Sequence, residues 1–228
     1  MKYSILAFSL SLPALADIAA GRQALKNGDY ATALSEFMPL AEQGDALAQA
    51  ALGAMYHQGY GVPQDYNQAV FWYRRAADQG DVLAQFNLGQ SYFRGEGVAK
   101  DYSEAARWYR IAADQGYAFA QGVLGAMYYE GRGVPQDYIQ AVSWNRRAAD
   151  QGDESAQYNL GVAYDKGQGI AQDYLRAHMW LNLAASRAKG DLQKRFADAR
   201  DRVASKMTLQ QIAEAQRLAR EWKPNASK

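Results

Sequence analysis

The chain has 228 residues, of which 49% are hydrophobic and 12% aromatic; this composition excludes an intrinsically disordered chain and allows a sizeable core. Its formal net charge of +1, without a run of Lys or Arg, does not favour binding to nucleic acid or to an anionic membrane surface. Cysteine is absent, which excludes disulfides, thiolate nucleophiles, thiolate zinc sites and a lipid-modified N-terminal cysteine.

Residues 1 to 16 are typical of a signal peptide. Lys2 is followed by an apolar stretch over residues 3 to 12, which is too short to span a bilayer, and Pro13 breaks it before a small-residue cleavage site ending at Ala16. The alternative is an apolar first helix that packs on the rest of the fold. If cleavage follows Ala16, the mature chain starts at Asp17, and we expect it to be periplasmic or secreted. No later segment is apolar enough for a membrane span, so we expect no membrane insertion of the mature chain.

Residues 17 to 43 predict a divergent helical hairpin. Ala24 and Leu25 lie on its first helix, Gly28 and Asp29 mark the turn, and Phe37 lies on the apolar side of the second helix.

A tandem repeat of 36 residues then covers residues 44 to 187 in four copies. Each copy opens with a glycine, continues with Ala-Gln and Leu-Gly pairs, and then has a tyrosine. The glycines are Gly44, Gly80, Gly116 and Gly152. A repeat of this length is one supersecondary unit that buries its apolar face by stacking on its neighbours.

The first half of each copy predicts a helix. In the second copy Leu83, Ala84, Leu88 and Tyr92 lie on one face, and Gly89 interrupts that face at a cost of roughly 1 kcal/mol in helix stability. Because a glycine recurs here in all four copies, we expect the backbone of the next helix to approach it closely. A Gly-x-Gly loop follows, and it indicates a helix end with left-handed residues; a nucleotide-binding loop would need a preceding strand and Gly-Lys-Ser/Thr.

The second half of each copy predicts a helix that begins at an aspartate. Asp65, Asp101, Asp137 and Asp173 are placed to cap it. Gln68, Glu104 and Gln140 follow at the spacing of a capping box, whereas the fourth copy has Arg176 there and should start more weakly. Four tryptophans share one position in these helices and are predicted to be core anchors: Trp72, Trp108, Trp144 and Trp180.

Residues 188 to 228 predict two capping helices. Leu192, Phe196, Ala199 and Val203 indicate the first, and a capping box from Thr208 to Gln211 starts the second, with Ile212, Ala215, Ala219 and Trp222 facing inward. A polar-backed terminal helix keeps a repeat array soluble. We expect residues 224 to 228 to fray.

The sequence predicts no catalytic residues, no cofactor and no metal site. His57 and His178 fall in the first and fourth copies, and neither lies in a His-Glu-x-x-His arrangement. Ser186 and Lys189 match a Ser-x-x-Lys pattern, but no Ser-Asp-Asn or Lys-Thr-Gly accompanies them.

These motifs resemble the SEL-one-like repeat family, a branch of the tetratricopeptide-like superfamily. The match is Ala-Gln-x-x-Leu-Gly-x-x-Tyr-x-x-Gly-x-Gly-Val-x-x-Asp-Tyr-x-x-Ala-x-x-Trp at residues 84–108, and it recurs over the four copies. The resemblance implies an all-α, right-handed α-solenoid of stacked helix–turn–helix repeats. It also implies a non-catalytic adaptor for protein complexes, with bacterial members in the cell envelope or in contact with hosts. A cysteine-rich branch is linked to penicillin binding and β-lactam hydrolysis, but it relies on disulfides that this chain lacks.

By analogy with tetratricopeptide arrays, the first helices should line a concave groove that binds a protein or peptide partner. The groove positions that vary between copies are Leu83, Phe86, Gln90, Phe93, Phe119, Tyr129, Tyr158 and Asp165. The aromatic members either form an exposed binding stripe or pack against the neighbouring repeat.

The sequence therefore predicts a protein–protein interaction scaffold or adaptor of the bacterial cell envelope. The alternative is an envelope enzyme that acts on peptidoglycan or β-lactams. We expect a monomer.

Overall fold

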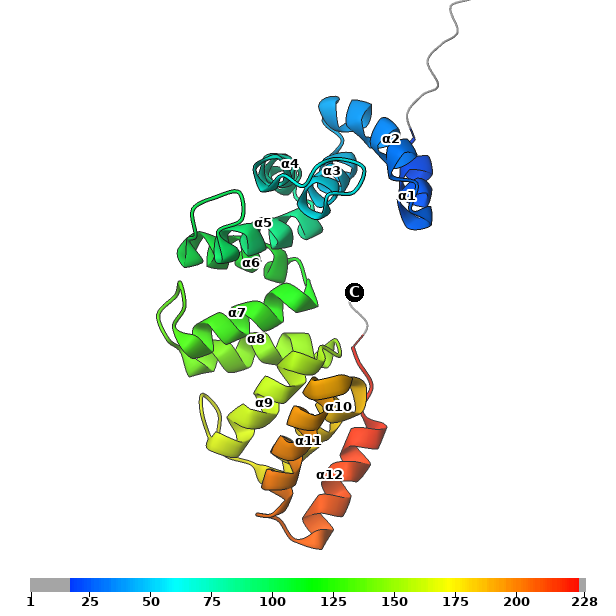
Figure 1. Ribbon diagram of the computed structural model, residues 1–228. Coiled ribbons are helices and arrows are strands. Elements are labelled where there is room, and N and C mark those ends of the chain that lie inside the picture. Colours follow the sequence, from blue (N-terminus) through cyan, green and yellow to red (C-terminus); the bar gives the residue numbers. More distant parts are fainter. Residues whose placement is uncertain (1–16, 226–228) are drawn as a thin grey trace, which may run out of the picture. The chain divides into compact units, whose positions relative to one another are not determined.

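The computed structural model describes residues 17–225, so the predicted signal peptide lies outside the described residues. Twelve α-helices and no strand occur in this part of the chain (Figure 1). The helices form two compact units, divided after Gln79. In each unit consecutive helices pack on one another, and the fold is the predicted all-α solenoid of helix pairs.

The first unit contains four helices: α1 (Ile18–Asn27), α2 (Tyr30–Glu42), α3 (Ala46–Gln58) and α4 (Tyr66–Asp78). Each packs on the next along the chain. The apolar core between them is built around Phe37, Leu52, Met55 and Trp72, which are all buried. The predicted hairpin of residues 17 to 43 is the pair α1 and α2.

The second unit contains eight helices: α5 (Val82–Arg94), α6 (Tyr102–Asp114), α7 (Ala118–Glu130), α8 (Tyr138–Asp150), α9 (Glu154–Lys166), α10 (Tyr174–Arg187), α11 (Gly190–Ala204) and α12 (Leu209–Glu221). Helices α5 to α10 pack in chain order, and α11 and α12 both pack on α10.

The second helix of each repeat begins at the predicted aspartate. Asp101, for example, accepts hydrogen bonds from the backbone N–H groups of Ser103 at 2.8 Å and Glu104 at 3.0 Å. The predicted capping box is wrong for these helices, because the backbone N–H of Asp101 already donates to the carbonyl of Tyr92 at 3.0 Å. Among the described helices, only α12 has the complete box, between Thr208 and Gln211.

Left-handed glycines end the first helix of each repeat, as predicted. Gly95 has φ 77° and Gly97 has φ 71°. The backbone N–H of Gly95 donates to the carbonyl of Ser91 at 2.8 Å and closes the last turn of α5. The Gly-x-Gly loop therefore ends a helix and follows no strand.

The glycine inside each first helix makes room for a side chain of the next helix. The buried ring of Tyr109 lies against Gly89, and a Cβ on Gly89 would come within 2.8 Å of that ring. In the fourth repeat the next helix backbone is also close, since a Cβ on Gly161 would lie 3.1 Å from the carbonyl oxygen of Ala177. A closer approach of backbone occurs in the loops. There Gly133 lies against the carbonyl of Tyr102, so a Cβ on Gly133 would overlap that oxygen.

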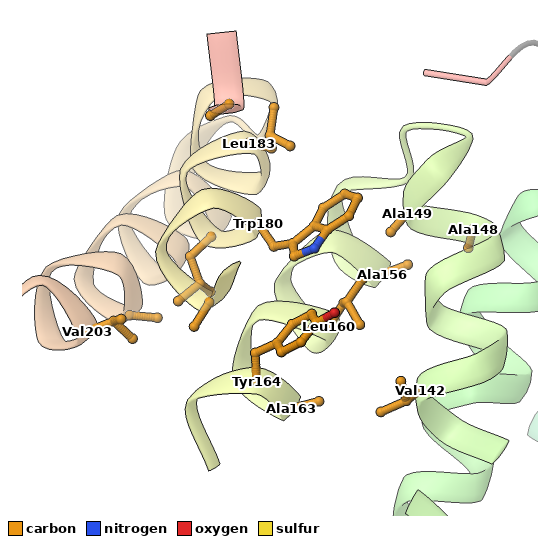
Figure 2. Close-up of a cluster of buried hydrophobic side chains, with 14 residues drawn as sticks. Val142, Ala148, Ala149, Ala156, Leu160, Ala163, Tyr164, Trp180, Leu183 and Val203 are labelled. Carbon is orange, nitrogen blue, oxygen red and sulfur yellow. The ribbon is translucent and has the colours of Figure 1, made fainter. Parts of the chain in front are cut away.

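The four repeat tryptophans are core residues, as predicted, with exposed fractions of 6–7%. Figure 2 shows Trp180 of α10 pointing toward Ala156 and Leu160 of α9. Such burial of a large ring on each pair is the main apolar contribution to the stack.

The C-terminal helices are mostly as predicted. Phe196, Ala199 and Val203 of α11 are buried, but the expected apolar position Leu192 is 45% exposed. The expected fraying is wrong for Asn225, whose backbone N–H donates to the carbonyl of Asp150 at 2.7 Å.

Candidate protein-binding surface

Two apolar side chains of the predicted groove are exposed at the start of first helices. Leu83 on α5 is 55% exposed and Phe119 on α7 is 59% exposed. The equivalent residue on α9 is the exposed Ser155. We call these three helix-start positions the first-helix face. Exposed apolar side chains at a repeated position make this face a candidate contact surface.

Phe86 and Phe93 of α5 are half-buried, because they pack inside their own repeat and its neighbour. The ring of Phe86 lies 5.5 Å from that of Tyr109 and 5.1 Å from that of Tyr117. The ring of Phe93 lies 5.0 Å from that of Tyr102. Of the two alternatives for the groove aromatics, an exposed binding stripe or packing against neighbouring residues, Phe86 and Phe93 therefore follow the second.

The ring of Tyr117 links Phe86 to the first-helix face. Its centroid is 5.6 Å from that of Phe119, so a chain of aromatic contacts runs from the buried Tyr109 outward to an exposed ring. Burial raises the pKa of the Tyr117 hydroxyl, as expected for a phenol that is partly removed from water.

Tyr129 and Tyr158 line a pocket of about 270 Å³ in the second unit. The hydroxyl of Tyr129 donates to Oε1 of Gln168 at 3.1 Å, and Nζ of Lys166 lies 3.4 Å from the same hydroxyl. The ring of Tyr158 stacks on Phe196 of α11 with the centroids 4.6 Å apart. The pocket is lined by residues of α7, α8, α9, the loop after α9 and α11: Ala126, Tyr129, Glu130, Tyr138, Ala141, Val142, Asn145, Tyr158, Asn159, Val162, Ala163, Lys166, Gln168 and Arg195. We call it the Asn145 pocket.

The sequence analysis did not predict this pocket, although a comparison of the four repeats shows a change of residue at one of its lining positions. The position after the repeat tryptophan is Tyr73 in the first copy, Tyr109 in the second, Asn145 in the third and Leu181 in the fourth. Each of these side chains lies against the glycine of its own first helix. In the third copy this residue is smaller than a tyrosine, and it lines the pocket.

The remaining predicted residues lie outside this pocket. Gln90 on α5 is half-buried and is not part of the pocket lining. Asp165 at the end of α9 is paired with Lys206, with Oδ1 and Nζ 2.6 Å apart. Because that contact joins α9 to the segment between α11 and α12, Asp165 has a partner within the chain.

The candidate catalytic side chains have ordinary structural roles. His178 is 2% exposed, and burial, followed by the nearby Arg200, lowers its pKa. The hydroxyl of Ser186 donates to the carbonyl of Leu183 at 2.8 Å, as serines near helix ends often do. Across residues 17–225 no group of three or more His, Cys, Asp or Glu side chains could hold a metal ion. In the same part of the chain, no helix has both the length and the hydropathy that crossing a bilayer requires.

Stacked helix pairs that repeat every 36 residues define an α-helical repeat protein. Four segments of the chain match the Sel1 repeat: residues 46–81, 82–117, 118–153 and 154–188. The chain therefore belongs to the Sel1 repeat family. Repeats of this family commonly mediate protein–protein interactions and are generally non-catalytic scaffolds.

Solved structures agree with this assignment. A protective antigen of uropathogenic Escherichia coli with an SLR fold superposes with a TM-score of 0.80 at 34% identity, over 90% of this chain and 45% of its own. This chain thus spans less than half of that antigen. A Sel1 repeat protein from Oxalobacter formigenes gives a TM-score of 0.74 at 34% identity, over 88% of this chain and 85% of its own.

A more distant likeness supports the fold alone. A Sel1 repeat protein from Klebsiella pneumoniae gives a TM-score of 0.51 at 24% identity, over 81% of this chain and 89% of its own. No curated protein matches the chain in sequence.

Proposed function

We propose that this protein is a non-catalytic scaffold or adaptor of the bacterial cell envelope, which binds a protein or peptide partner along its first helices. The observation that carries the proposal is the exposure of Leu83 and Phe119 at one repeated position. Both residues belong to repeats of a kind that commonly binds proteins. When a partner covers an apolar side chain that is more than half exposed, the removal of that side chain from water stabilises the complex.

The proposed location rests on the N-terminal sequence. Cleavage after Ala16 would leave Asp17 as the first residue, and Asp17 caps α1 by accepting a hydrogen bond from the N–H of Ala19 at 2.8 Å. The exported chain would therefore keep the whole of α1. Expression of the full chain in a Gram-negative host, fractionation and intact-mass measurement test this. A cytosolic product that keeps residues 1 to 16 would contradict export.

The binding face is tested with a matched pair of variants. The double variant Leu83→Ser/Phe119→Ser removes the two exposed apolar side chains of the first-helix face. The control Ile139→Ser/Leu209→Ser removes apolar side chains that are 69% and 86% exposed on α8 and α12. Because all four side chains are exposed, both variants should fold, and circular dichroism checks this.

The parent chain and the two double variants, each beginning at Asp17, are used to capture partners from envelope extract. We expect one captured protein to be lost with the first-helix variant and kept with the control. Equal capture by all three proteins would place the contact elsewhere. Turnover of a chromogenic β-lactam by the purified chain would contradict the non-catalytic role. Light scattering of the same sample tests the monomer that we propose.

A further inference from the structure

The Asn145 pocket is bordered by the residue that corresponds to a tyrosine in the first two repeats. The rings of Tyr73 and Tyr109 lie directly against Gly53 and Gly89. In the third repeat the shorter amide of Asn145 lies against the corresponding glycine. A tyrosine ring is thus one of the groups that this position accommodates in the chain.

At a second position that lines the pocket, the third repeat also has a smaller residue than the second repeat. The first helix of the second repeat has Gln90 where that of the third repeat has Ala126, and Ala126 lines the pocket. The apolar wall includes Val142 of α8 and Ala163 of α9, both labelled in Figure 2. Two residues that are smaller than their counterparts in the second repeat thus line a pocket of about 270 Å³.

Aromatic residues surround the open space, as they surround Tyr109. In the second repeat the ring of Tyr109 lies 5.5 Å from that of Phe86. In the pocket, Tyr129 and Tyr138 lie 5.3 Å apart, and Tyr158 is held by its stack on α11. A ring that enters would have aromatic neighbours at ordinary packing distances.

Polar groups in the pocket favour a phenol over a phenyl ring. Asn145 is 4% exposed, and its Oδ1 accepts a hydrogen bond from Nδ2 of Asn159 at the long distance of 3.4 Å. Both amides line the pocket, so a hydroxyl between them could replace this weak contact with shorter ones. A phenyl ring would leave the amides without that partner.

The charges around the pocket favour an acidic neighbour of that tyrosine. Nζ of Lys166 lies 3.4 Å from the hydroxyl of Tyr129, and the guanidinium of Arg195 lies over the ring of Tyr158, 5.0 Å from its centroid. Glu130 also lines the pocket, but its carboxylate is paired with Arg132 at 2.8 Å. The lining therefore has two cations whose charge is not neutralised by a carboxylate in the described part of the chain.

We infer that the Asn145 pocket binds a tyrosine side chain of the protein partner, with an acidic residue beside that tyrosine facing Lys166 and Arg195. The inference rests on the proposed scaffold function, and it adds the chemistry of the segment that the scaffold recognises. Electrostatic attraction selects the acidic segment, and the ring supplies the buried anchor.

The test uses a short peptide as the probe. Acetyl-Gly-Glu-Tyr-Glu-Gly-amide is titrated into the isotope-labelled chain from Asp17, and amide chemical shifts are followed by NMR. We expect saturable shifts at Asn145, Asn159 and Lys166. A peptide with Ala in place of Tyr should bind at least about tenfold more weakly, and one with Lys in place of both Glu residues should also bind more weakly. No shift at peptide concentrations of about 2 mM would overturn the inference.

The decisive variant is Asn145→Tyr, which fills the pocket with the residue that the first two repeats carry. We expect it to fold and to lose peptide binding. If it does not fold, Ala126→Gln narrows the pocket with the residue of the second repeat. Arg195→Glu should weaken binding, whereas the control Arg202→Glu, an exposed cation on the same helix, should not. Unchanged binding in the filled variant would contradict the inference.

Envelope capture separates this inference from the proposed function. If Asn145→Tyr still captures a partner that Leu83→Ser/Phe119→Ser loses, the scaffold function stands and the tyrosine inference is wrong. If the peptide binds in the pocket but no envelope protein is captured, the proposed function is wrong.

Discussion

Gln121 is a buried glutamine that joins three consecutive helices of the second unit. It is 4% exposed on α7, its Nε2 donates to the carbonyl of Ala113 on α6 at 3.0 Å, and its Oε1 accepts from Nε2 of Gln151 after α8 at 2.8 Å. Both polar atoms of the amide are therefore bonded. The equivalent residue of the next repeat, Gln157, is also buried, but it differs in one respect. Its Nε2 donates to the carbonyl of Ala149 at 3.2 Å, whereas its Oε1 has no hydrogen-bond partner among residues 17–225.

This difference has a cause in the sequence. The residue that corresponds to Gln151 in the fourth repeat is Arg187, which donates to the carbonyl of Gly152 at 3.1 Å. Gln121→Leu removes two hydrogen bonds of about 1 kcal/mol each, while the Ala113 carbonyl keeps the backbone N–H of Gly116 as a donor at 3.0 Å, so we expect a loss of about 2 kcal/mol. Gln157→Leu removes one bond but also a buried unsatisfied oxygen, so we expect a loss of about 0–1 kcal/mol.

Urea unfolding followed by far-UV circular dichroism measures both losses against the parent chain. For a chain of this size, a difference of about 1–2 kcal/mol corresponds to a melting temperature about 2–8 °C lower for Gln121→Leu than for Gln157→Leu. Equal destabilisation of the two variants, or a larger loss for Gln157→Leu, would refute the reasoning. Unfolding transitions that depend on the probe would show independent melting of repeats, and only the first transition would then be compared.

Three further predictions use the same unfolding assay. Gly89→Ala should destabilise by about 1–3 kcal/mol, despite the better helix propensity of alanine, because its Cβ would overlap the buried ring of Tyr109; a stabilised variant would contradict this. Asp137→Ala should cost about 1 kcal/mol by removing the cap of α8, and Asp137→Asn should restore most of it. Burial lowers the pKa of His178 below the ordinary 6.5, so the unfolded chain binds more protons as the pH falls below about 6.5, and the free energy of unfolding decreases. His178→Gln should reduce that decrease, and an unchanged pH dependence would count against it.

Local rules account for what could be predicted from the sequence. The 36-residue spacing sets the helix pairs, the aspartates cap the second helices, and the loop glycines adopt left-handed conformations that other residues rarely tolerate. The tryptophans are buried because each lies on the apolar stripe of its helix. The caps, the turns and the apolar stripes depend on residues a few positions apart, and the repeat is visible by comparing the chain with itself, so one sequence is enough to predict them.

Contacts between helices determine the features that the sequence did not predict, which are the exposure of individual groove residues and the absence of capping boxes in the second helices. Leu83 and Phe86 lie three residues apart on α5, yet Leu83 is exposed while Phe86 packs against rings from α6 and the start of α7. The periodicity of one helix indicates an apolar face but not which part of that face a neighbour covers. The predicted capping boxes do not form for the same reason. The backbone N–H of Asp101 already donates to the carbonyl of Tyr92, nine positions earlier.

The Asn145 pocket depends both on a change of residue that the sequence shows and on packing that only the structure shows. The change from tyrosine to asparagine is visible in the internal alignment, and an asparagine in a helix says nothing by itself about a cavity. Only the tertiary structure shows that no neighbouring side chain fills the space and that Lys166 and Arg195, from two different helices, lie beside it. The sequence by itself determined the repeat, its caps and its buried anchors, because these depend on local backbone chemistry. The exposure of each groove residue and the presence of a pocket were decided by tertiary packing, since they depend on how side chains distant in the chain fill the space between helices.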